Sequence, residues 1–161
     1  MTNGEIYSLE ATNLLKSYEA AQDNYVQLYN LYQQREEDLG SVQYAVNNAV
    51  PNKEQALFNA KWVRDQAAKL KDQAEQAREI TYQAAYRQIF VETITRTDAA
   101  KRALSGKNLV AAFARAAYYA KQKATRATQS QDYAEELLFT ARCHALETAA
   151  GIEIGARLQQ R

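Results

Sequence analysis

The sequence predicts an all-α protein, folded as an elongated antiparallel three-helix coiled-coil bundle in a single domain over residues 1–161. Two observations support this prediction. There are only one Pro and five Gly, which leaves few places for turns and therefore requires long elements. Apolar side chains also recur every three to four residues along most of the chain, as they do on one face of a helix. A four- or five-helix up-down bundle is the alternative.

The first helix is expected over residues 4–48, with Thr2 and Glu5 as a capping box at its start. Its apolar stripe repeats about every 3.5 residues, which is the period of a coiled-coil seam. Gly40 is a candidate kink, although the stripe continues across it. The stripe comprises Tyr7, Ala11, Leu14, Tyr18, Ala21, Tyr25, Leu28, Tyr32, Arg35, Leu39, Val42, Val46 and Ala49.

The second helix is expected over residues 52–104, after a turn at Val50-Pro51, because Pro disfavours helical geometry in the residue before it. Thr97-Asp98 is a candidate break. The apolar arc widens near the middle of this helix, which indicates a second contact surface, either the third helix or another protomer. The wide arc comprises Tyr82, Tyr86, Ile89 and Phe90. The expected core stripe comprises Ala56, Ala60, Val63, Ala67, Leu70, Ala74, Ala77, Ile80 or Thr81, Ala84, Val91 and Ile94.

The third helix is expected over residues 109–155, after a turn at residues 105–108 in which Gly106 suits the left-handed end of a helix. Residues 128–130, Thr-Gln-Ser, are its weakest point and a candidate break. Large residues on the first seam would face mostly Ala on the other two, which permits close packing. The third stripe comprises Val110, Phe113, Ala117, Ala120, Ala124, Ala127, Gln131, Ala134, Leu138, Ala141, Ala145, Thr148 and Ile152.

The sequence argues against an enzyme, and no catalytic, metal-binding or cofactor-binding residue is expected. His144 is the only histidine, and no Glu-x-x-His element of a di-iron bundle occurs. His144 adjoins Cys143 and lies near Glu147, but adjacent helical residues point about 100° apart and do not readily share a metal. There is also no Gly-rich phosphate loop and no nucleophile elbow.

A cytoplasmic location is expected. Cys143 is the only cysteine, so no disulfide can form within the chain. No apolar run approaches the ~20 residues of a membrane span. The N-terminal residues lack the basic start and the apolar segment of a secretory signal.

Charge is distributed unevenly along a chain whose net charge is only +1. Residues 1–50 carry a net charge of −5, and residues 96–126 carry +7. Basic residues interleaved with aromatic ones can bind nucleic acid or an anionic membrane surface. The candidate anion-binding residues are Arg102, Lys107, Arg115, Lys121, Lys123 and Arg126. The alternative is that the first helix neutralises them through Glu5, Glu10, Glu19 and Asp23.

These observations favour a non-enzymatic protein that binds protein partners, as a scaffold or adaptor, and that self-associates. Tyr29, Tyr44 and Tyr119 lie off the seams and are candidate interface residues, because Tyr is enriched at interfaces. One alternative is a module that binds anionic lipid surfaces or nucleic acid through residues 96–126. Another is a secreted, translocator-type coiled-coil component, because long antiparallel helical rods also occur in that class.

Arg35 is the one charge on the first seam, and we expect it to fix the alignment of the helices, as single polar seam residues do in coiled coils. Antiparallel pairing about a turn near Val50 places Arg35 level with Asp65. Parallel alignment with the third helix would place it near Glu135 or Glu136. The alternative is that Arg35 extends outward to water.

Overall fold

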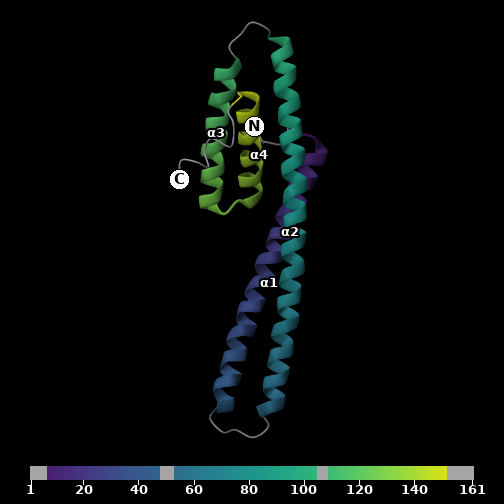
Figure 1. Ribbon diagram of the computed structural model, residues 1–161, viewed down its shortest axis with the longest axis vertical. Coiled ribbons are helices and arrows are strands. Elements are labelled where there is room, and N and C mark those ends of the chain that lie inside the picture. Colours follow the sequence, from purple (N-terminus) through teal and green to yellow (C-terminus); the bar gives the residue numbers. More distant parts are fainter. Residues whose placement is uncertain (1–6, 48–52, 105–108, 152–161) are drawn as a thin grey trace. The chain divides into compact units, whose positions relative to one another are not determined.

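The computed structural model describes residues 7–47, 53–104 and 109–151, and these residues form four α-helices with no β-strand among them (Figure 1). The prediction of an all-α protein is therefore confirmed. The prediction of three helices is wrong, because the third predicted helix is divided in two. The helices are α1 (Leu9–Asn47), α2 (Lys53–Ala103), α3 (Leu109–Ser130) and α4 (Tyr133–Ala149).

The break between α3 and α4 lies just after the candidate break at residues 128–130. Gln131 has a φ of 59°, in the left-handed region that ends helices, and Asp132 caps the next helix. The Asp132 carboxylate accepts a hydrogen bond from the Glu135 backbone N–H at 3.0 Å. The two other candidate breaks are not used, because α1 continues through Gly40 and α2 continues through Thr97-Asp98.

The start of α1 differs from the prediction. Ser8 is the residue before the helix, and its hydroxyl accepts a hydrogen bond from the Ala11 N–H at 3.1 Å. The Ser8 N–H and hydroxyl also donate to the Glu92 carboxylate of α2. The predicted capping box of Thr2 and Glu5 lies outside the described residues, as do the predicted turns at Val50-Pro51 and at residues 105–108.

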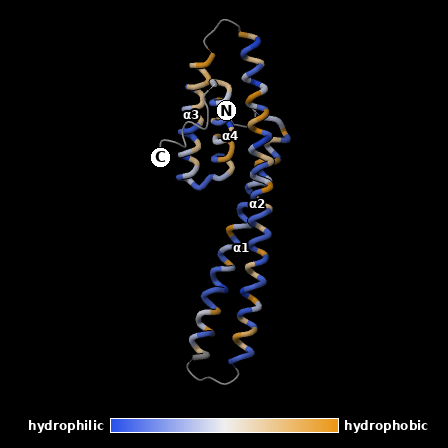
Figure 2. Tube along the Cα trace, viewed as in Figure 1, coloured by the Kyte–Doolittle hydropathy of each residue, from blue (hydrophilic) through white to orange (hydrophobic). Residues whose placement is uncertain are grey.

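The chain divides into two compact units. Unit 1 comprises residues 1–19 and 81–161, and unit 2 comprises residues 20–80. Helices α1 and α2 contribute to both units, whereas α3 and α4 belong to unit 1 alone. The described residues of unit 2 therefore form two helical segments, and Figure 2 shows that most of these residues are hydrophilic, with hydrophobic residues recurring at intervals.

In unit 2, α1 and α2 run antiparallel and are joined by cations that lie over tyrosine rings. The Arg78 guanidinium is 4.4 Å from the centroid of the Tyr25 ring, and the Lys71 amine is 5.4 Å from that of Tyr32. The residue numbers of both pairs add up to 103, so the register is the same at two positions one heptad apart.

The predicted seam of α1 is confirmed, because every described member whose side-chain position is defined is buried or half-buried. The predicted stripe of α2 is partly wrong. Ile80 is 70% exposed and Val91 is 53% exposed, whereas Ile89 is fully buried. The other exposed members of the predicted α2 stripe are Ala56, Leu70, Ala77 and Ala84. The residues of α2 that are buried are Ala67, Ala74, Ala85, Ile89, Thr93 and Thr97.

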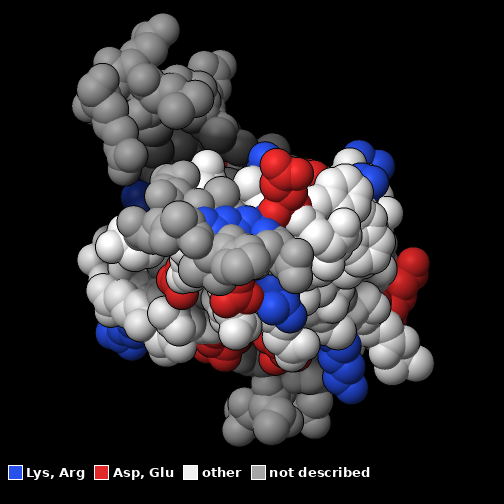
Figure 3. All heavy atoms as spheres, turned by 90° about the horizontal axis from the view of Figure 1, so that it is seen from below, with Lys and Arg blue, Asp and Glu red and all other residues white. Residues whose placement is uncertain are grey.

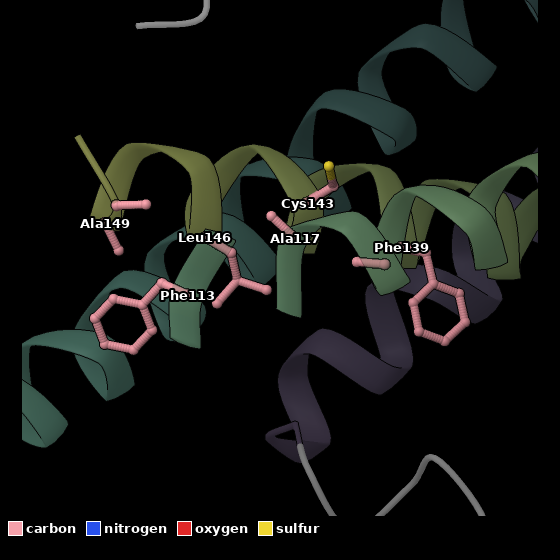
Figure 4. Packing of buried hydrophobic residues seen from close by; sticks show 8 residues of the cluster. Phe113, Ala117, Phe139, Cys143, Leu146 and Ala149 are labelled. Atoms are coloured by element: carbon pink, nitrogen blue, oxygen red, sulfur yellow. The ribbon is translucent and has the colours of Figure 1, made fainter. Parts of the chain in front are cut away.

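The core of unit 1 surrounds α4, which is apolar on several sides. Three consecutive residues of α4 each join a different cluster, so neighbours cover it from several directions. Leu137 packs with Tyr18 and Ala85, and Leu138 packs with Ala11 and Ile89. Phe139 belongs to the cluster between α3 and α4, where Figure 4 shows side chains from both helices pointing toward one another. That cluster comprises Phe113, Ala117, Ala120, Phe139, Cys143, Leu146, Ala149 and Ala150.

Candidate interaction surface

The exposed side of α3 is the most distinctive surface in unit 1. Helix α3 carries four cations and no carboxylate over its whole length. Its buried stripe comprises Phe113, Ala117, Ala120 and Ala127, so the opposite side faces solvent. We call that side the cationic face of α3, and it comprises Arg115, Tyr118, Tyr119, Gln122 and Arg126, with Lys121 and Lys123 at its edges.

The spacing of these residues produces one continuous strip. Arg115, Tyr119, Gln122 and Arg126 follow one another at intervals of four, three and four residues, which keeps them on one side of a helix. The two arginines are separated by about 16 Å along the axis, at 1.5 Å per residue. Between them, Tyr118 and Tyr119 are 59% and 58% exposed, with ring centroids 5.9 Å apart.

Within the described part of unit 1, no carboxylate forms an ion pair with the four cations of α3. The ion pairs of the basic segment lie on α2, where Arg96 pairs with Glu92 and Lys101 pairs with Asp98. The Lys123 amine instead lies 4.8 Å from the centroid of the Phe139 ring. The alternative that Glu10 or Glu19 neutralises α3 is therefore not observed in unit 1.

The structure describes five of the six candidate anion-binding residues and places them on two helices. Arg115, Lys121, Lys123 and Arg126 are exposed together on α3, and Arg102 is exposed near the end of α2. Lys107 lies outside the described residues. On the face of the molecule seen in Figure 3, Lys and Arg alternate with Asp and Glu in small groups. Over a whole helix, the four described cations without any carboxylate set α3 apart from α1, α2 and α4.

A groove between α3 and α4 contains two adjoining cavities of about 360 and 300 Å³. Lys121, Thr125 and Glu147 line both of them. Glu147 is only 4% exposed, although a carboxylate is seldom buried. Nothing in the sequence distinguishes it from the other charged residues of α4, Glu135, Glu136 and Arg142.

His144 contacts a tyrosine of α2. Its Nδ1 lies 2.8 Å from the Tyr86 hydroxyl, and either atom can donate. Burial, followed by the neighbouring Tyr82 and Cys143, raises the pKa of Tyr86 above its ordinary value, so this phenol stays neutral. Among the described residues, no group of three or more His, Cys, Asp or Glu side chains is placed to hold a metal ion.

The wide apolar arc of α2 is packed inside unit 1. Ile89 is buried against Ala11 and Leu138, and Tyr86 bonds to His144. The Tyr82 ring meets the Tyr18 ring edge-on, with centroids 5.6 Å apart. Packing against α1 and α4 therefore accounts for this arc, and self-association through Tyr82, Tyr86, Ile89 and Phe90 stays a prediction. Tyr29, Tyr44 and Tyr119, by contrast, are exposed.

Arg35 does not form the cross-helix ion pair of unit 2. Its Nη1 contacts Asp38 of the same helix at 2.9 Å, and its side chain is 38% exposed. The cross-helix pair is one residue away, where Arg64 donates to Glu36 at 3.1 Å. Asp65 accepts from Arg64.

Glu135 and Glu136 lie in the first turn of α4 in unit 1. The positive end of the helix dipole stabilises negatively charged side chains at this position. The proposed pairing of Arg35 with Asp65 is not observed in unit 2, where Asp65 pairs with Arg64.

No family model, no curated protein and no solved structure matches this chain, so its function must be argued from its own residues. Across the part of the chain that the structure describes, no helix combines the length and the apolar character that crossing a membrane requires.

Proposed function

We propose that this chain is a non-enzymatic binding protein, of the scaffold or adaptor type, and that the cationic face of α3 binds an acidic surface of a protein partner. One observation supports this above the others. Four cations stand on one helix without a carboxylate, and no described carboxylate of unit 1 pairs with them. Unpaired charges of one sign attract an oppositely charged partner and orient its approach.

The residues at the centre of the face favour a protein partner. Tyr and Arg are the residue types enriched in the cores of protein interfaces, and both occur here side by side. Arg115 and Arg126 can each bind a carboxylate through two parallel hydrogen bonds. Tyr118 and Tyr119 present exposed aromatic rings between these two arginines. A central aromatic pair with charges around it is the arrangement expected of a binding hot spot.

Nucleic acid or an anionic lipid surface is the second candidate partner. It is favoured by the same tyrosine pair, because bases stack on exposed aromatic rings that lie between cations. The charge of the whole chain weakens this candidate. A net charge of +1 and an isoelectric point of about 7.8 differ from the strongly basic character of most nucleic-acid-binding domains.

The test is a titration with a Glu-rich peptide at low and high salt. The unmodified chain is expected to bind the peptide at low salt, and salt should weaken binding because the charges are exposed. The triple variant Arg115→Glu, Lys121→Glu, Arg126→Glu should lose the binding by at least about tenfold, since like charges then oppose each other. Circular dichroism of this variant should show unchanged helicity.

A matched control carries the same change of charge elsewhere. The variant Lys16→Glu, Lys61→Glu, Lys69→Glu changes exposed lysines of α1 and α2 and should keep most of the binding. If the control loses as much affinity as the α3 variant, binding depends on net charge and not on this face. If duplex DNA or phosphatidylserine vesicles bind the unmodified chain more tightly than the peptide does, the second candidate replaces the first.

A further inference from the structure

We infer that the acidic surface bound by the cationic face of α3 belongs to a second copy of this chain, and that it is the outward side of α1 in unit 2. This inference rests on the proposed function and names the partner for the same face. Charge complementarity supports it. In unit 2, α1 carries Asp23, Glu36, Glu37 and Asp38 against Arg35 alone, whereas α3 carries four cations and no carboxylate.

The outward side of α1 has the same layout as the cationic face, with opposite charge. Asp23, Val26 and Glu37 are exposed on the side of α1 away from its seam with α2. Tyr29 is exposed at the edge of that side, with its ring centroid 6.0 Å from that of the seam residue Tyr25. Val26 and Tyr29 lie between the two carboxylates. On α3, Tyr118 and Tyr119 lie between two arginines. Each strip therefore has an apolar or aromatic centre with charges at both ends, and the two sets of charges are opposite.

The distances along the two helices also agree. Asp23 and Glu37 are separated by about 21 Å along the axis, and Arg115 and Arg126 by about 16 Å. Long flexible Arg side chains span the difference of a few ångströms. Among the described residues, Asp23 and Glu37 form no ion pair, whereas Glu36 and Asp38 do.

A second copy would also cover apolar surface that two helices cannot bury. The described helices of unit 2 share one seam. Val26 is 39% exposed on the side away from it, and Tyr29 is 42% exposed at the edge of that side. A two-helix segment leaves its outer sides to solvent, whereas a contacting helix removes apolar area from water. The tyrosine pair of α3 supplies a matching apolar centre for that contact.

The experiment is a charge swap followed by sedimentation equilibrium at low salt. One variant reverses α3 (Arg115→Glu, Arg126→Glu), and the other reverses α1 (Asp23→Lys, Glu37→Lys). The unmodified chain should self-associate at high micromolar concentration, and each variant alone should be monomeric. An equimolar mixture of the two variants should associate again, because the reversed strips complement each other.

A control variant separates this contact from an effect of net charge. The Lys61→Glu, Lys69→Glu variant carries the same change of net charge as the α3 variant, but it keeps both strips. It should therefore self-associate as the unmodified chain does, whereas the α3 variant should not. If the unmodified chain is monomeric, or if the α1 variant associates as well as the unmodified chain does, the inference is overturned. Binding of the Glu-rich peptide is measured separately, so its persistence would leave the proposed function standing with another protein as the partner.

Discussion

Glu36 and Arg64 face each other across the two helices of unit 2, with Arg64 Nη1 donating to Glu36 Oε1 at 3.1 Å. The Tyr32 hydroxyl donates to the same carboxylate oxygen at 2.8 Å. This carboxylate therefore receives one bond from its own helix and one from the neighbouring helix. An exposed ion pair contributes little to stability. A carboxylate that accepts hydrogen bonds from both helices nevertheless favours this alignment of α1 with α2 over alignments shifted along the helix axis.

The hydrogen bonds to Glu36 give unit 2 a pH dependence. Donation by Tyr32, and then by Arg64, lowers the pKa of Glu36 below its ordinary value of 4.5. A lowered pKa in the folded chain means that the carboxylate stabilises the fold above pH 4.5, and that this contribution is lost as the pH falls through the lowered pKa. Glu36→Gln should therefore reduce the melting temperature at pH 7 and have a smaller effect at pH 3.

The control for this prediction is Glu37→Gln, which changes an exposed neighbour that forms no ion pair with a described residue. Its effect on the melting temperature should be small at pH 7. A Glu36→Gln effect that is equally large at both pH values would show that the substitution acts through packing and not through charge.

The two isoleucines of α2 differ sharply in burial and give a direct test of the core of unit 1. Ile89 is fully buried against Ala11, Leu138 and Ala141. Ile89→Ala should lower the free energy of unfolding by about 2–5 kcal/mol, since it removes buried methyl groups and leaves a cavity. Ile80 is 70% exposed, so Ile80→Ala should change stability by no more than about 0.5 kcal/mol. Urea unfolding of both variants checks the difference, and equal effects would contradict the assignment.

The Asp132 carboxylate caps α4 at the α3–α4 turn, beside a backbone hydrogen bond from the Asp132 N–H to the Ala127 carbonyl. Asp132→Ala removes the acceptor for the Glu135 N–H and should lower the free energy of unfolding by about 1 kcal/mol. Asp132→Asn keeps an acceptor and should be close to neutral. Gln131→Gly should not destabilise the chain, because Gly adopts the positive φ of this position without steric cost. A loss of stability in the Gln131→Gly variant would contradict the positive φ of residue 131 in this turn.

The contact between Tyr86 and His144 joins α2 to α4 in unit 1. Tyr86→Phe keeps the ring in place and removes the hydroxyl that lies 2.8 Å from Nδ1. Loss of one part-buried hydrogen bond should lower the free energy of unfolding by about 1 kcal/mol. Tyr119→Phe changes an exposed tyrosine and should have no measurable effect on stability. Chemical denaturation of the two variants compares them directly.

The seam of α1 was predictable because it repeats a large apolar residue at almost every turn. The stripe of α2 was not, and the reason lies in its threonines. Thr93 and Thr97 are buried, with hydroxyls that donate to the carbonyls of Ile89 and Ile94. A Thr whose hydroxyl donates to a carbonyl of its own helix can be buried. A search for apolar residues at helical spacing nevertheless counts it as polar and passes over it. The predicted stripe therefore includes Val91, which is exposed, and it offers the exposed Ile80 as an alternative to the half-buried Thr81.

The start of α4 has a signal in the sequence, in addition to the candidate break at residues 128–130. Asp132 and Glu135 have the spacing of a capping residue and an acidic residue three positions later. The positive φ of Gln131 has no such signal, since Gln rarely occupies that region. The cations of α3 were visible in the sequence, but only the structure shows that no described carboxylate of unit 1 pairs with them.

The central claim is that an acidic partner binds the cationic face of α3. Carbodiimide joins amines to carboxylates that are in direct contact, so it reports the site itself. With the Glu-rich peptide present, we expect cross-links to form mainly at Lys121 and Lys123, and to disappear at high salt. Cross-links distributed equally over exposed lysines such as Lys16, Lys61 and Lys69 would contradict the claim, because the peptide would then have no preferred surface.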